Sequence, residues 1–152
     1  MQKVVIADTS CLIVLRKINR LDLLQNLFGS ITITRTIAAE YKLPLPNWIV
    51  VAQPVETETF LYLTGRLDAG ESEAIALAAE TQDSLLVIDE HKGKAVAKQL
   101  KLDIIGTLGV ILKAKEAGVI ESVKDVLTEL RTQTDFRFSA AIEAVVLKKA
   151  GE

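Results

Sequence analysis

Short apolar runs alternate along the chain with segments of helical periodicity. The runs at residues 4–7 and 85–88 are continuously apolar, which is typical of strands buried on both faces of a sheet. Residues 31–34, 48–51 and 103–105 are rich in β-branched and other apolar residues and predict further strands. Because strands alternate with helices, the pattern predicts an α/β fold: a three-layer α/β/α domain around a central parallel sheet of 4–5 strands.

Nine segments predict the helices. Five cover residues 12–18, 21–28, 35–43, 56–64 and 71–81, and four more follow residues 90, 106, 122 and 139. Residues 65–70 are expected to form a loop. The helical spacing places Leu61 and Leu100 among the inward-facing residues, and the last helix carries Ile142, Val145 and Val146. Residues 1–152 are expected to form a single domain, with the C-terminal helices at about 122–150 packed on it.

Composition narrows the class of protein. The chain has 152 residues, of which 49% are hydrophobic, so one sizeable core is expected. No apolar run approaches the roughly 20 residues of a membrane span, and no signal-type segment opens the chain, so a cytoplasmic protein is expected. The single Cys and single His cannot build a zinc cluster. The net charge of −2 argues against a large basic surface that binds nucleic acid by electrostatic attraction. A divalent cation bound at an acidic site would, however, reverse the sign of the electrostatic field there.

Acidic residues end the two most apolar strands. Asp8 follows the first, and Asp89 with Glu90 follows the run at 85–88. If these strands are neighbours, Asp8 and Asp89 meet at the carboxyl edge of the sheet, where open α/β sheets place their sites. A simple N-cap is the alternative role for either aspartate.

Two further carboxylates accompany this pair. Glu40 lies in the last turn of a helix, where it opposes the helix dipole. Glu71 shares a helix face with Ala74, Ile75 and Ala78, although Asp68 and Glu71 together also resemble a capping box. Clustered carboxylates repel one another unless a cation joins them, and oxygen-only ligands suit Mg²⁺ or Mn²⁺.

Other chemistries fit the sequence less well. The chain has no GxxxxGK[ST], GxGxxG or GxSxG motif. Cys11 and His91 could form a catalytic pair, but Cys11 is followed by apolar residues and is more typical of a small buried side chain.

Taken together, these motifs resemble the PIN-domain ribonucleases. Ile6-Ala7-Asp8-Thr9-Ser10 resembles the opening of that family, and Glu40, the segment 70–78 and the segment 86–90 follow in the family's order. The resemblance covers about residues 1–120. Residues 106–118 resemble a poorly characterised prokaryotic branch of predicted nucleic-acid-binding proteins.

The resemblance implies a parallel sheet in the order 3-2-1-4-5 and a Mg²⁺- or Mn²⁺-dependent endoribonuclease site. By position, Asp8, Glu40, Glu71 and Asp89 would be the catalytic and metal-binding acids. One departure is that Ile88, rather than a hydroxyl residue, precedes Asp89, so Glu90 and Glu73 are alternative ligands. The supporting residues are Thr9 or Ser10, whose hydroxyl would orient the first aspartate, and Thr107.

The resemblance also implies partners. It implies a role as the toxin of a toxin–antitoxin pair. An RNA substrate, a cognate antitoxin protein and a homodimer are expected, with no membrane. Arg35, Lys92 and Lys94 are candidate phosphate contacts. The alternative is a catalytically weak or inactive module of the same fold that binds RNA or protein.

Overall fold

The computed structural model describes residues 3–152 and contains a five-stranded parallel sheet. The strands are β1 (Val4–Ala7), β2 (Ile31–Ile33), β3 (Ile49–Val51), β4 (Ser84–Val87) and β5 (Asp103–Ile105). Their order is β3-β2-β1-β4-β5, and every neighbouring pair is parallel, which confirms the predicted α/β class and strand order.

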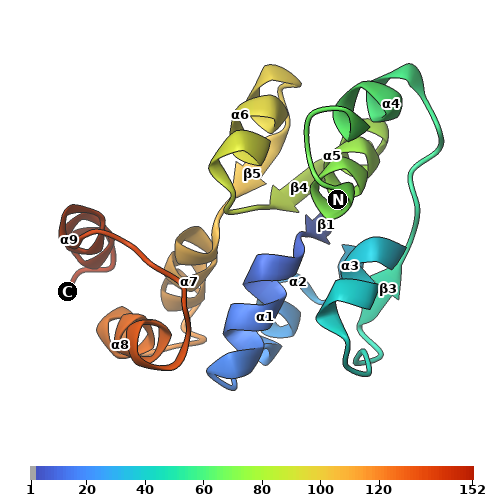
Figure 1. Ribbon diagram of the computed structural model, residues 1–152. Helices are drawn as coiled ribbons and strands as arrows, with labels where there is room; N and C mark the ends of the chain where they lie inside the picture. The colour runs from blue at the N-terminus through green and yellow to red at the C-terminus, as the bar shows by residue number, and fades with distance from the viewer. Residues whose placement is uncertain (1–2) are drawn as a thin grey trace.

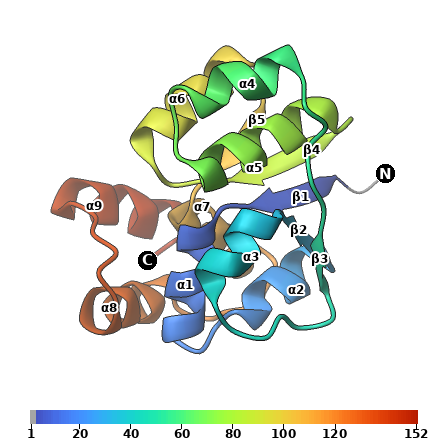
Figure 2. The same cartoon turned by 45° about the vertical axis from the view of Figure 1, so that its right-hand side comes forward.

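Helices cover both faces of this sheet (Figures 1 and 2). The first half of the chain supplies α1 (Thr9–Lys17), α2 (Asp22–Phe28), α3 (Arg35–Tyr41) and α4 (Glu58–Thr64). The second half supplies α5 (Ala69–Glu80), α6 (His91–Gln99), α7 (Thr107–Glu116), α8 (Val123–Gln133) and α9 (Ala140–Lys149). Helices α4, α5 and α6 lie on one side of the strands, and α1, α2 and α7 lie on the other. Helix α3 contacts both α1 and α5.

The central strands and α5 form the middle of the core. Ile6 and Ala7 of β1 and Leu86 and Val87 of β4 are fully buried, as expected for strands covered on both faces. Helix α5 buries Ala74, Ala76 and Ala78, whose small side chains allow it to lie close to β1 and β4. It begins at Ala69, two residues earlier than predicted, because the Asp68 side chain accepts a hydrogen bond from the Glu71 N–H and caps it.

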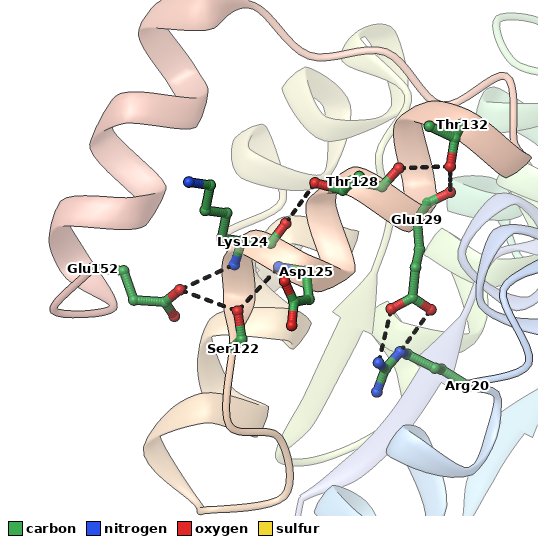
Figure 3. A network of polar contacts seen from close by, with 8 residues as sticks. All are labelled: Arg20, Ser122, Lys124, Asp125, Thr128, Glu129, Thr132 and Glu152. Carbon is green, nitrogen blue, oxygen red and sulfur yellow. Dashed lines mark hydrogen bonds and ion pairs between the residues drawn. The ribbon is translucent and has the colours of Figure 1, made fainter.

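The C-terminal helices α8 and α9 contact α7 and each other. Figure 3 shows the polar contacts that fix α8. Arg20 donates from Nε and Nη2 to the two carboxylate oxygens of Glu129 at 3.1 and 2.8 Å. The Glu152 carboxylate accepts from the backbone N–H groups of Val123 and Lys124 at the start of α8. A carboxylate at this position is favoured by the positive end of the helix dipole.

Two expected core positions are wrong: Leu61 of α4 and Leu100 at the end of α6 are exposed. Ile142 and Val145 of α9 are exposed as well. Helices α4 and α9 lie at the outside of the molecule and each buries a single residue, Leu63 and Val146. Within residues 3–152, no helix has the length and apolar character that crossing a bilayer requires.

Candidate active site

The strand register brings Asp8 and Asp89 to the same edge of the sheet. Ala7 of β1 is paired with Val87 of β4, and the Asp8 N–H donates to the Val87 carbonyl oxygen at 2.9 Å. The Ile88 N–H donates in turn to the Ile105 carbonyl oxygen of β5, also at 2.9 Å. Both aspartates therefore follow the carboxyl ends of adjacent strands, where they flank the middle of the sheet.

Asp89 is held by the first residue of α7. The backbone N–H of Thr107 donates to Asp89 Oδ1 at 2.9 Å, and the Thr107 hydroxyl donates to Oδ2 at 2.5 Å. Thr107 is itself fully buried. A hydroxyl therefore reaches Asp89 from α7, although Ile88 occupies the preceding position in the sequence.

Glu40 is linked to the start of α1. The Thr9 hydroxyl donates to Glu40 Oε2 at 3.1 Å, while the Thr9 backbone N–H donates to Asp8 Oδ1 at 2.8 Å. Asp8 is thus oriented by a backbone amide, and the Thr9 hydroxyl binds Glu40 instead of the first aspartate. The side chain of Ser10 is exposed.

Asp68 is a member of this site that the sequence analysis treated only as a helix cap. Glu40 lies against the start of α5, because a Cβ atom added at Gly70 would fall 2.6 Å from Glu40 Oε1. Asp68 is two residues before Gly70, and its charge acts on Asp8 more strongly than those of Glu40 and Asp89. We call Asp8, Glu40, Asp68 and Asp89 the acidic cluster.

The electrostatics of Asp8 reflect this crowding. Asp8 is 8% exposed, and burial raises its pKa from 3.8 to about 6. The hydrogen bond from Thr9 opposes the shift, whereas the charges of Asp68, Glu40 and Asp89 add to it. At neutral pH, an ionised Asp8 therefore sits in surroundings that disfavour its charge.

Glu71 lies beside the acidic cluster and faces two other carboxylates. It is also 8% exposed, and its Oε2 atom is buried without a hydrogen-bond donor. Burial, followed by the neighbouring carboxyl groups of Asp68 and Glu90, to which a protonated Glu71 can donate, raises its pKa to about 9. The side chain of Glu71 is also the main cause of the lowered pKa of Asp68. At neutral pH, Glu71 therefore holds the proton and Asp68 is ionised.

A protein-family model described as a PIN domain matches residues 4–152. The chain belongs to the PIN-domain family. No curated protein and no solved structure gives a significant match to it. PIN domains are generally nucleases that act on nucleic acid and typically use divalent metal ions. The resemblance found in the sequence is therefore confirmed, and with it a nuclease-type fold.

The two alternative ligands of this PIN domain have other contacts. Glu90 is exposed and caps α6, and its Oε2 accepts from the Gly93 N–H at 2.7 Å. Glu73 accepts from the Thr36 hydroxyl at 2.5 Å through Oε2. Glu90 lies on the Glu71 side of the site, since a Cβ atom added at Gly93 would approach both carboxyl groups.

Of the three basic candidates, Lys94 lies beside Asp89. A Cβ atom added at Gly106 would fall 2.8 Å from Asp89 Oδ1 and 3.3 Å from Lys94 Nζ, so the two side chains share that corner of the PIN domain. Lys94 is partly buried, whereas Lys92 and Arg35 are exposed at the starts of α6 and α3.

The environment of Cys11 argues against a Cys–His nucleophile. Cys11 is fully buried, and burial raises the pKa of its thiol to about 12. The thiolate that such a mechanism needs is therefore not formed at neutral pH. His91 is exposed at the first position of α6.

The donor chemistry of the acidic cluster fits a hard divalent cation, because all its side chains offer carboxylate oxygens. Burial and, to a smaller extent, the neighbouring carboxylates raise the pKa of Asp8, and a bound cation would favour its ionised form against both. Within residues 3–152, however, no three His, Cys, Asp or Glu side chains are grouped closely enough to hold a metal ion. The described residues therefore include suitable ligand types, but these side chains are not drawn together into a metal-binding group.

Proposed function

We propose that this PIN domain is a divalent-metal-dependent endoribonuclease that hydrolyses RNA phosphodiesters at the acidic cluster. One observation carries the proposal. Asp8 and Asp89 follow adjacent central strands, and the pKa of Asp8 is raised by burial and by three neighbouring carboxylates. Carboxyl groups whose pKa is raised by burial and by neighbouring charges are typical of functional sites.

The proposed roles follow from the contacts. Asp8 and Asp89 would hold Mg²⁺ or Mn²⁺, with Glu40 and Asp68 completing the carboxylate surroundings, and the ion would supply activation of water and stabilisation of phosphate charge. Thr107 fixes both oxygens of Asp89, and Thr9 links Asp8 with Glu40. Glu71 is a further proposed ligand once it loses its proton.

Asp8→Asn tests the proposal. Asparagine keeps the oxygen that accepts from Thr9 and removes the charge, so metal-dependent cleavage of single-stranded RNA should be lost. Because the pKa of Asp8 is raised by about two units, the neutral side chain should not destabilise the fold and could stabilise it by up to about 3 kcal/mol at pH 7.5.

The matched control is Asp22→Asn, which removes one negative charge from the exposed first turn of α2. This variant should cleave RNA like the wild type. Cleavage that requires Mg²⁺ or Mn²⁺ and survives Asp8→Asn, in protein freed of contaminating nuclease, would contradict the proposed role.

A second candidate is a PIN-like module that binds RNA or protein without cleaving it. The absence of three grouped ligand side chains in residues 3–152 favours this alternative. Calorimetric titration with Mn²⁺ separates the two candidates: no binding at millimolar metal supports the non-catalytic module. Binding that is lost in Asp8→Asn supports the nuclease.

The toxin role, the antitoxin partner and the homodimer are proposals that follow from the family resemblance. Induced expression should arrest growth if the chain is a toxin, and Asp8→Asn should remove the arrest. Sedimentation of the purified protein measures its oligomeric state.

A further inference from the structure

A pocket of about 340 Å³ opens next to Asp89, on the side of α7 and of the connector between α8 and α9. This volume lies at the small end of the range for ligand sites. Asp89 and Lys94 line one part of the pocket. Leu108 of α7 and Phe136, Arg137 and Phe138 of the connector line another. The pocket therefore joins the acidic cluster to an aromatic surface.

The aromatic wall is held in place by the connector. The Thr134 hydroxyl accepts from the Phe136 N–H at 3.1 Å and donates to the Leu130 carbonyl oxygen at 2.7 Å. Ser139 caps α9 by accepting from the Ile142 N–H. A segment tied at both ends loses little conformational freedom when it binds a ligand.

The two rings are available for stacking. Phe136 and Phe138 are only partly buried, and their centroids are 6.2 Å apart with planes inclined at 43°. The guanidinium of Arg131 lies 4.7 Å from the centre of the Phe138 ring, and Arg131 is paired with Glu143. The Arg131 guanidinium therefore contacts the Phe138 ring by a cation–π interaction. The same ring also lines the pocket.

Two cationic side chains line this pocket. Lys94 lies beside Asp89, and Arg137 is exposed, with Nη1 directed to the carbonyl oxygens of Thr134 and Phe136. On the side of Glu71, the exposed Glu90 is a further carboxylate, ionised because hydrogen bonds from backbone N–H groups of α6 lower its pKa, and it would repel a polyanion. A nucleic-acid strand is therefore best accommodated on the side of Lys94.

From this arrangement we propose that the pocket holds one unpaired nucleotide of a single-stranded RNA, next to the phosphodiester at Asp89. The base would lie against Phe136 and Phe138, and its phosphate would lie near Lys94 and Arg137. A base within a duplex is covered by its neighbours and cannot enter, so the pocket selects single strands. This inference rests on the proposed function and adds to it a subsite for a base.

Phe138→Leu tests the stacking because leucine keeps an apolar side chain but removes the π-face. Fluorescence anisotropy in EDTA would measure binding of a labelled short single-stranded RNA. We expect binding to weaken about 5- to 100-fold, as loss of one base–aromatic stack predicts. Phe28→Leu is the matched control, since Phe28 is partly buried in a pocket with Val5 and Lys113.

Abasic strands separate stacking from general damage. When the base that occupies the pocket is removed, the wild type and Phe138→Leu should bind with nearly equal affinity. An equal loss on intact and abasic strands would overturn the inference, as would unchanged binding by Phe138→Leu or equally tight binding of duplex RNA by the wild type. Urea unfolding of both variants checks that they are folded.

The salt dependence of RNA binding tests whether Lys94 contacts a phosphate. Lys94→Gln should reduce the slope of log K against log salt by about 0.7, as expected for one phosphate contact on a single strand. Lys17→Gln, at the far end of α1 from Asp8, should leave the slope unchanged. An unchanged slope in Lys94→Gln would overturn the phosphate contact.

Kinetics distinguish failure of this inference from failure of the proposed function. Phe138→Leu should raise KM and leave kcat nearly unchanged, because stacking at a distance from the reacting phosphate contributes uniform binding. Cleavage that depends on Asp8, together with unaltered binding by Phe138→Leu, would reject the base pocket alone. Cleavage that survives Asp8→Asn would reject the nuclease site, whatever the binding data show.

Discussion

Glu71 provides a test of the site that requires no substrate. Its pKa is raised from 4.5 to about 9 by burial and by the hydrogen bonds to Asp68 and Glu90. In the unfolded chain Glu71 is ionised above pH 4.5, whereas in the folded protein it keeps its proton up to about pH 9. The folded state therefore binds one proton more in this range, and stability falls as the pH rises.

Glu71→Gln should remove this dependence, because glutamine is neutral and can donate to the same two carboxylates. A difference of one proton corresponds to about 1.4 kcal/mol per pH unit. Between pH 6.5 and 8.5, the free energy of unfolding of Glu71→Gln should therefore rise relative to the wild type by about 2–3 kcal/mol in total. Asp8, with its pKa of about 6, contributes equally to both proteins.

Urea unfolding in EDTA at pH 6.5, 7.5 and 8.5 measures this difference. EDTA keeps metal ions from ionising Glu71. Glu116→Gln on the exposed surface of α7 controls for the loss of one negative charge. If the stabilities of wild type and Glu71→Gln run parallel with pH, Glu71 is ionised in the folded protein and the reasoning about its proton is wrong.

Two further predictions concern the acidic cluster and the core. Gly70→Ala should reduce cleavage without loss of stability: the new Cβ displaces Glu40, whose Oε1 is 2.6 Å away, while alanine favours the helix by up to about 1 kcal/mol. Gly65→Ala, with its nearest neighbour at 3.7 Å, should leave cleavage unchanged, and equal activity of the two variants would show that Glu40 is dispensable. In urea unfolding, Leu15→Ala should cost about 2–5 kcal/mol because Leu15 is fully buried, whereas Leu61→Ala should cost almost nothing; similar losses would contradict the burial assigned to α1 and α4.

The strands and most helices could be predicted from sequence because their signals are local. Continuous apolar residues at 4–7 require cover on both faces, and Ser122 and Ser139 cap the helices predicted to follow them. The sequence cannot distinguish an apolar helix face that meets the core from one that meets solvent. Ile142 and Val145 have core-like spacing but are exposed in α9.

The candidate site divides in the same way. Asp8 and Asp89 were predictable because each follows an apolar strand, and parallel neighbours end at one edge. Asp68 was missed as a member because its capping role explains it fully at the level of the sequence. Its effect on Asp8 depends on how α5 packs against α3, which also contacts α1, and no local pattern encodes that packing.

The amino-acid sequence by itself determined which segments are strands, which residues can carry negative charge, and the family to which the chain belongs. Only the tertiary structure decided the partner of each carboxyl group: Thr107 for Asp89, Thr9 for Glu40, and Asp68 with Glu90 for Glu71. The physical reason is that burial and the charges of sequence-distant neighbours set a carboxyl group's proton affinity, and both arise only when the helices pack on the sheet.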